Sequence, residues 1–120
     1  MRIYISGPMT GHSDNNFDAF WNAANRLRGE GHFVINPAEL SAHFGTEEEI
    51  AESFNAAYTN NEYMPEARLA RSIMSADLAA VRSCDAIYLL RGWESSRGAK
   101  KELAEAIAHG LTVMQEGAGA

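Results

Sequence analysis

The chain has 120 residues, of which 46% are apolar and 22% charged, with a formal net charge of −6. This length and composition fit one globular domain, which we assign to residues 1–116, with residues 117–120 as a frayed tail. The acidic balance argues against a nucleic-acid polymer as partner. The longest uncharged apolar run, 86–90, is far shorter than the ~20 residues of a membrane span, so no membrane partner is expected.

The first third of the chain predicts strand, helix, strand. Strands are expected over residues 2–5 and 33–35, where short apolar runs end at turns that contain glycine or proline. A helix lies between them, with Ser13 or Asp14 as its cap. Its apolar residues recur at helical spacing. They are Phe17, Phe20, Trp21, Ala24 and Leu27.

Two helices are expected in the middle of the chain. The segment 41–63 predicts the first, because Thr46 precedes three glutamates suited to a helix N-terminus and a thin apolar stripe follows. Pro65 is suited to the first position of the second helix, and its apolar spacing continues to about Arg82.

The last third predicts the centre of the sheet. Residues 86–90 are typical of a parallel strand covered on both faces. A helix from Gly98 to Gly110 and a strand over 111–114 complete the order. The whole pattern indicates an α/β fold, a doubly wound and mainly parallel sheet of four to five strands with helices on both faces, of the flavodoxin-like type. The last helix should face the core with Ala99, Leu103, Ala106 and Ile107.

Ligands of such sheets bind outside the carboxyl ends of the strands, where the loops 6–16, 36–40 and 91–98 gather. The first loop is rich in small residues and leads into a helix N-terminus, which favours anions. It lacks the spacing of a Walker A or dinucleotide fingerprint. It predicts either a cradle for sugar or phosphate or a plain tight turn. The residues concerned are Ser6, Gly7, Pro8, Met9 and Gly11.

Two acids are candidates for chemistry. Glu102 lies near the start of the last helix, where it either stays ionised as a nucleophile must or only complements the helix dipole as a surface acid. Asp77 lies at the edge of an apolar helix face, where it either shifts its pKa or is solvated. Asp85 precedes its strand, away from the crevice, and is interpreted as structural.

The loop before the last helix offers a hydroxyl-rich anion site and an aromatic ring. Ser95 and Ser96, with Arg97 and Gly98, are suited to hold a phosphate through hydroxyls and backbone N–H groups. The alternative is that Ser96 only caps the helix. Trp93 either stacks on a base or fills a core edge.

No metal and no cofactor are expected. The four histidines have no metal-ligand spacing. Cys84 is the single cysteine, which excludes an intramolecular disulfide, and it is more typical of a buried apolar residue than of a nucleophile. The first residues lack a signal-peptide pattern. We therefore expect a cytoplasmic location.

Several blocks of the sequence resemble the nucleoside 2-deoxyribosyltransferase superfamily, over nearly the whole chain. Within it the chain resembles a small uncharacterised branch of phages and bacteria, DUF4406, marked by Leu-x-Gly-Trp-Glu-x-Ser-x-Gly-Ala, here residues 90–99. The branch is related to nucleoside 5′-monophosphate N-glycosidases. The blocks are Tyr4-Ile5-Ser6-Gly7-Pro8-Met9, Asp77-Leu78, Cys84-Asp85-Ala86-Ile87-Tyr88-Leu89-Leu90 and Ser96-x-Gly98-Ala99-x-x-Glu102.

This resemblance implies a deoxyribosyltransferase-like fold and an enzyme that cleaves or transfers the N-glycosidic bond of a nucleoside 5′-monophosphate through a covalent glutamyl-sugar intermediate. Glu102 falls on the catalytic glutamate, Asp77 on the aspartate that assists at the sugar and leaving base, and Tyr4 on the tyrosine that orients the pocket. Ser96 falls on the serine that holds the 5′-phosphate. The partner is then a small nucleotide or nucleoside, and the protein a homodimer or larger homo-oligomer.

Two other classes of function stay open. One is a nucleotide-binding sensor or regulator that keeps the crevice without turnover. The other is an interaction protein that binds a partner through Trp93 and the acidic segment 47–52.

Overall fold

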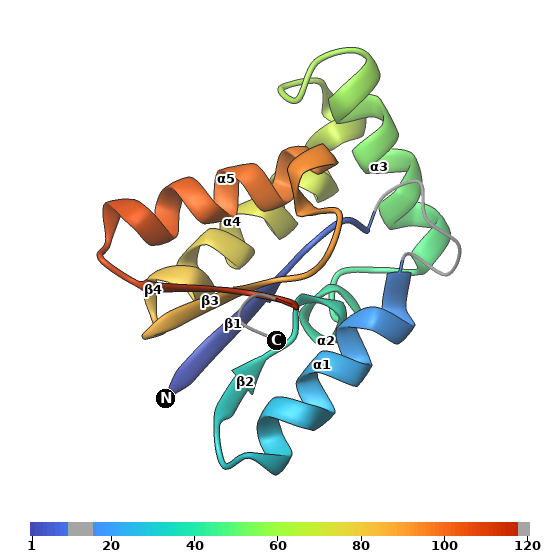
Figure 1. Cartoon of the computed structure of the whole chain (residues 1–120). Coiled ribbons are helices and arrows are strands. Elements are labelled where there is room, and N and C mark those ends of the chain that lie inside the picture. The colour runs from blue at the N-terminus through green and yellow to red at the C-terminus, as the bar shows by residue number, and fades with distance from the viewer. Residues whose placement is uncertain (10–15, 118–120) are drawn as a thin grey trace.

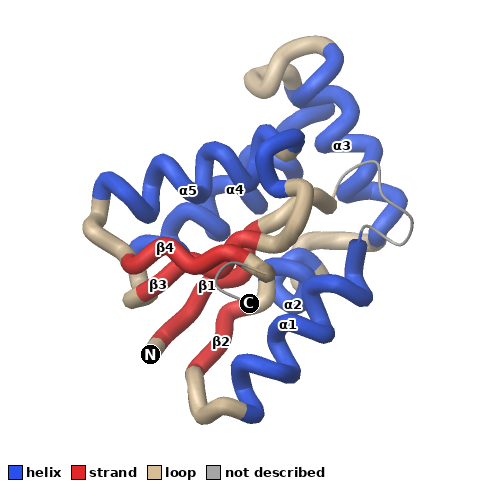
Figure 2. The backbone as a smooth tube through the Cα atoms, in the orientation of Figure 1, coloured by secondary structure: helices blue, strands red, loops and turns tan. Residues whose placement is uncertain are grey.

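The computed structural model describes residues 1–9 and 16–117, and it contains a parallel sheet between two layers of helices (Figure 1). Helices α1 (Phe17–Gly29) and α2 (Pro37–Ser41) lie on one face, and α4 (Arg68–Arg82) and α5 (Arg97–Ala108) on the other (Figure 2). The expected doubly wound α/β fold is confirmed. The four strands, in the sheet order β2-β1-β3-β4, are β1 (Arg2–Ser6), β2 (Phe33–Ile35), β3 (Ala86–Leu89) and β4 (Thr112–Gln115).

The two faces of the sheet come from the alternation of side chains along β1. Successive residues of a strand point to opposite faces. Ile3 and Ile5 therefore pack in the cluster under α1, whereas Tyr4 packs in the cluster under α4 and α5. Residues of β3 alternate in the same way, so this strand is buried on both faces, as its unbroken apolar run predicted. One consequence is that Tyr4 and Ser6 share the α5 side.

The sheet order reverses at β1, which has β2 on one side and β3 on the other. In such sheets the ligand crevice opens at this reversal, outside the carboxyl ends of the strands. Just past these ends the Leu90 N–H donates to the Ser6 carbonyl at 2.8 Å. A Cβ on Gly7 would lie 2.7 Å from the Leu90 Cβ. Glycine at position 7 is thus required by close packing of the two segments at the base of the crevice.

Helix α3 (Glu47–Thr59) lies beyond the carboxyl ends of the strands and packs beside α4 (Figure 1). Thr46 is its N-cap and shares reciprocal hydrogen bonds with Glu49, at 3.2 Å to the threonine hydroxyl and 3.0 Å to the glutamate carboxylate. This confirms the helix predicted within residues 41–63. Pro65 begins a 3-10 turn that leads directly into α4.

Three local predictions are wrong. Residues 36–40 are not a loop, because Asn36 caps α2 by accepting the Ala38 N–H at 3.0 Å and proline follows at the first helical position. Trp21 and Ile107 do not face the core but are 41% and 62% exposed. Each follows a buried residue of its helix, Phe20 in α1 and Ala106 in α5. Because successive residues are about 100° apart around a helix, Trp21 and Ile107 point away from the core. The predicted caps Ser13 and Asp14 lie outside the described residues.

Candidate active site

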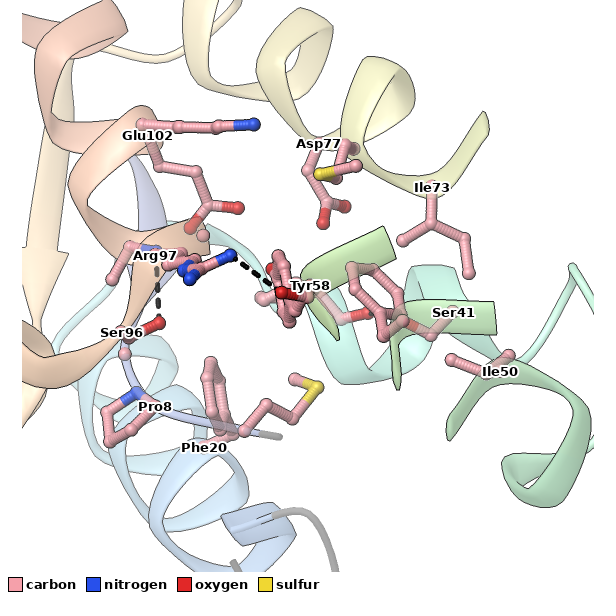
Figure 3. Close-up of a pocket in the computed structure, with 18 of the residues that line it drawn as sticks. Pro8, Phe20, Ser41, Ile50, Tyr58, Ile73, Asp77, Ser96, Arg97 and Glu102 are labelled. Atoms are coloured by element: carbon pink, nitrogen blue, oxygen red, sulfur yellow. Dashed lines mark hydrogen bonds between the residues drawn. The ribbon is translucent and has the colours of Figure 1, made fainter. Parts of the chain in front are cut away.

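The centre of the candidate site is the carboxylate of Glu102, on the second turn of α5 (Figure 3). It accepts two hydrogen bonds from β1. The Tyr4 hydroxyl donates to Oε2 at 2.7 Å, and the Ser6 hydroxyl donates to Oε1 at 2.5 Å. Both donors are fully buried and lie two residues apart, so the pleat of the strand directs both toward α5. The structure therefore brings three of the predicted site residues into direct contact.

Glu102 is half-buried and is not the surface acid of the simpler interpretation. Burial raises the pKa of its carboxyl to about 7, although the hydrogen bonds from Ser6 and Tyr4 act in the opposite direction. Burial therefore opposes the ionisation of Glu102 that its place near the helix N-terminus favours. Desolvation is the larger effect, and the two hydroxyl donors limit the rise.

Asp77 extends from α4 toward the same cavity (Figure 3). Its Oδ1 atom is buried and has no hydrogen-bond partner among the described residues. Burial, and then the charge of Glu102, raises the pKa of Asp77 to about 8. Asp77 is therefore a desolvated acid and not the solvated helix-edge acid that the sequence left open.

The two carboxyl groups differ in what stabilises their charged forms. Two nearby carboxyls in a poorly solvated site tend to share one proton. Glu102 has two hydroxyl donors to its carboxylate, whereas Oδ1 of Asp77 has no such donor in the described part of the chain. Near neutral pH the favoured state is therefore an ionised Glu102 beside a protonated Asp77. A nucleophile and a proton donor in one site are the requirements for breaking a bond to a leaving group that needs a proton.

Tyr4 remains a neutral hydrogen-bond donor. Burial, followed by the negative charge of Glu102, raises the pKa of the Tyr4 hydroxyl well above its usual range. Its role in this arrangement is to hold the carboxylate in position.

Glu102 and Asp77 line a cavity of about 400 Å³, whose wall also includes residues of α1, α2, α3 and the loop after β1. Tyr4 and Ser6 lie behind Glu102 and do not line it. Trp93 packs at the edge of the core cluster that contains Tyr4, which matches the core-edge alternative. Gly11 lies outside the described residues. The other predicted site residues in the lining are Gly7, Pro8, Met9, Ser96 and Gly98.

Ser96 is both the N-cap of α5 and part of the cavity wall. Its hydroxyl accepts the Ala99 N–H at 3.1 Å, which confirms the capping interpretation. Beside it, Arg97 donates to the Tyr58 carbonyl at 3.2 Å, and the carbon of its guanidinium lies 5.3 Å from the centre of the Tyr58 ring (Figure 3). The start of α5 thus presents a hydroxyl and a guanidinium at the cavity.

Sequence reasoning missed the wall that α3 contributes. Ile50, Phe54 and Tyr58 recur every four residues, so they share one helix face, and all three line the cavity. The rings of Phe54 and Tyr58 are 5.7 Å apart and inclined at 50°. The spacing was visible in the sequence as a thin apolar stripe. Local spacing alone does not say that this stripe faces a cavity.

No metal centre is apparent in residues 1–9 and 16–117, since no three His, Cys, Asp or Glu side chains gather there as a set that could hold an ion. Over the same ranges, no helix combines the length and the apolar character that crossing a membrane requires.

Comparison with known proteins gives one family. The sequence profile described as "Domain of unknown function (DUF4406)" matches residues 1–115. A comparison with curated proteins gave no match. The matched range extends from β1 through β4 and includes both carboxyl groups and the loops around them.

Proposed function

The chain belongs to the DUF4406 family, and from its site we propose that it cleaves, or transfers, the N-glycosidic bond of a nucleoside 5′-monophosphate. The observation that carries the proposal is the carboxyl pair in the cavity. Glu102 has the hydrogen bonds of a positioned carboxylate, and Asp77 has the environment of a carboxylic acid that keeps its proton. The resemblance of the sequence motifs to nucleoside 2-deoxyribosyltransferases supports the same reaction.

In the first step a Glu102 oxygen attacks C1′ of the sugar and forms an ester bond. The bond between C1′ and the base nitrogen breaks, and its electron pair stays with the base, which takes the proton from Asp77. Such a reaction passes through an oxocarbenium-like state that a carboxylate on one face stabilises and then captures. Tyr4 and Ser6 hold the attacking carboxylate in place throughout.

In the second step water attacks C1′ and gives a proton to the Asp77 carboxylate. The ester bond to Glu102 breaks, which releases the sugar 5-phosphate and restores both carboxyl groups. In a transfer reaction the nitrogen of a second base replaces the water. A reaction split in this way uses Asp77 as acid and then as base.

The start of α5 supports a monophosphate as the substrate class. Ser96 and Arg97 line the cavity beside the first backbone N–H groups of a twelve-residue helix, and these groups favour an anion. Charge-assisted hydrogen bonds of this kind are stronger than neutral ones. A phosphate there places the sugar between it and the carboxyl pair.

Replacement of Ser96 tests the phosphate assignment. Ser96→Ala is expected to raise KM for monophosphates by at least about tenfold, since a hydrogen bond to a charged group contributes about 1.5–3 kcal/mol, and to leave KM for free nucleosides unchanged. Ser96→Asp keeps a capping oxygen for α5 but adds a negative charge, so it should keep the stability of the wild type and weaken monophosphate binding further. Equal changes in KM for nucleotides and nucleosides would contradict the assignment.

The reaction itself is tested by chromatography of base release from a panel of ribo- and deoxyribonucleoside monophosphates and free nucleosides. We expect release of base from at least one monophosphate, and none with Glu102→Gln. Saturable binding without release from any compound would favour the nucleotide sensor instead. The homodimer or larger assembly and the cytoplasmic location stay predictions.

A further inference from the structure

Apart from Pro8 and Phe20, which lie beside Ser96, the cavity has two chemically different halves (Figure 3). On the α5 side the wall carries the hydroxyl of Ser96, the guanidinium of Arg97 and the carboxylate of Glu102. On the α3 side the wall consists mainly of carbon, from Ile50, Phe54 and their neighbours on α4. A ligand that fills both halves must be charged at one end and largely apolar at the other.

The boundary between the halves lies at Asp77. Ile73 is four residues before Asp77 on α4, so the two side chains lie one turn apart on the same helix face, and both line the cavity. The apolar half therefore begins one helical turn from the group that donates the proton in the proposed reaction. The atoms that receive that proton belong to the leaving base.

We propose that the α3 half of the cavity is the subsite for the base, and that it recognises the base by apolar and aromatic contact and not by its pattern of hydrogen bonds. This inference rests on the proposed function and names the substrate class more closely. The preferred substrates are monophosphates whose base carries an apolar substituent, such as a methyl group.

Few polar side chains on this side are able to read the edge of a base. The Ser41 hydroxyl already donates to the Pro37 carbonyl at 2.9 Å. Glu47, the first residue of α3, is exposed at the outer end of the cavity. The Tyr58 ring packs against Phe54 and the Arg97 guanidinium, and its hydroxyl lies near Gly98, on the α5 side of the cavity. Because the α3 half offers the base mainly apolar side chains, it distinguishes bases by apolar contact.

Calorimetry with the inactive Glu102→Gln protein tests the inference with two pairs of nucleotides and one ligand without a base. The pairs are deoxyuridine and thymidine monophosphate, and deoxyadenosine and N6-methyldeoxyadenosine monophosphate. Each pair differs by one methyl group. The ligand without a base is deoxyribose 5-phosphate. We expect the methylated member of the bound pair to bind about fourfold tighter, the gain for burying one methyl group. Both members should bind at least about tenfold tighter than the sugar phosphate.

Two variants locate the effect on α3. Ile50→Ser and Phe54→Ala should each weaken nucleotide binding at least about fivefold and remove the methyl preference, while Kd for deoxyribose 5-phosphate changes less than about twofold. Ile107→Ser makes the same chemical change at an exposed position of α5 and should alter none of these constants.

The outcomes separate the inference from the proposed function. Equal binding of methylated and unmethylated nucleotides, or an equal loss for nucleotides and sugar phosphate in the α3 variants, would overturn the base subsite and leave the reaction standing. Binding of none of the five ligands would remove both.

Discussion

Glu102→Gln is expected to lower base release from the preferred nucleotide by at least about a thousandfold, since loss of a nucleophile removes the covalent route. Glutamine has nearly the same volume, and its carbonyl can still accept a hydrogen bond from Tyr4 or Ser6. Kd for the nucleotide should therefore stay within about tenfold of the wild-type value. Chromatography gives the rate and calorimetry gives Kd.

A matched control for this variant lies on the same helix. Glu105→Gln makes the same change in α5, at a residue that pairs with Arg82 at 3.0 Å and does not line the cavity, so its turnover should equal that of the wild type. Turnover of Glu102→Gln within about tenfold of the wild type would rule out Glu102 as the nucleophile.

Glu102→Ala is a poorer test of the nucleophile than Glu102→Gln, because the alanine variant is also expected to lose stability. A first-turn surface acid would contribute less than ~1 kcal/mol to stability. The structure instead shows that Glu102 accepts hydrogen bonds from two fully buried hydroxyls. A buried hydroxyl that loses its partner costs about 1–3 kcal/mol, so Glu102→Ala combines loss of chemistry with loss of stability.

Asp77→Asn is expected to lower the rate of base release by about a hundredfold or more, the usual contribution of a general acid. The loss should be largest for bases that leave poorly without a proton. The wild-type pH profile of kcat/KM should be bell-shaped, with its limbs near 7 and 8, because catalysis needs an ionised Glu102 and a protonated Asp77. These limbs belong to the pair and not to one residue. In Asp77→Asn the alkaline limb should disappear.

The same substitution has an expected effect on stability that depends on pH. The carboxyl of Asp77 keeps its proton up to about pH 8 in the folded protein but loses it near the ordinary pKa of about 3.9 when unfolded. Between these values the folded state binds more protons, so the free energy of unfolding falls as pH rises. Asparagine at position 77 has no proton to lose in this range. The free energy of unfolding of Asp77→Asn should therefore rise relative to that of the wild type as the pH increases from 5 to 8.

Urea unfolding at these two pH values measures the difference, with Asp18→Asn on the exposed face of α1 as the control. The control should follow the wild type at both pH values. An Asp77→Asn protein with the same dependence on pH as the wild type would show that Asp77 is not desolvated in the folded state.

Local pattern was sufficient for the four strands and the longer helices, but not for α2, which it predicted as a loop. The strand and helix periods of residues 2–5 and 65–82, and the Thr46 cap, depend on neighbours a few residues apart, so they can be read along the chain. The fold class followed from the order of these strands and helices because parallel strands joined by helices have few ways to pack.

The state of the site was decided only by tertiary packing. Tyr4 donates to Glu102 across 98 positions in the sequence, and the pKa values of Glu102 and Asp77 depend on how much water the assembled helices exclude. The apolar wall of α3 became part of a cavity only when α3 packed beside α4. Hydrogen bonds between distant segments and desolvation are properties of the packed molecule, and no local spacing encodes them.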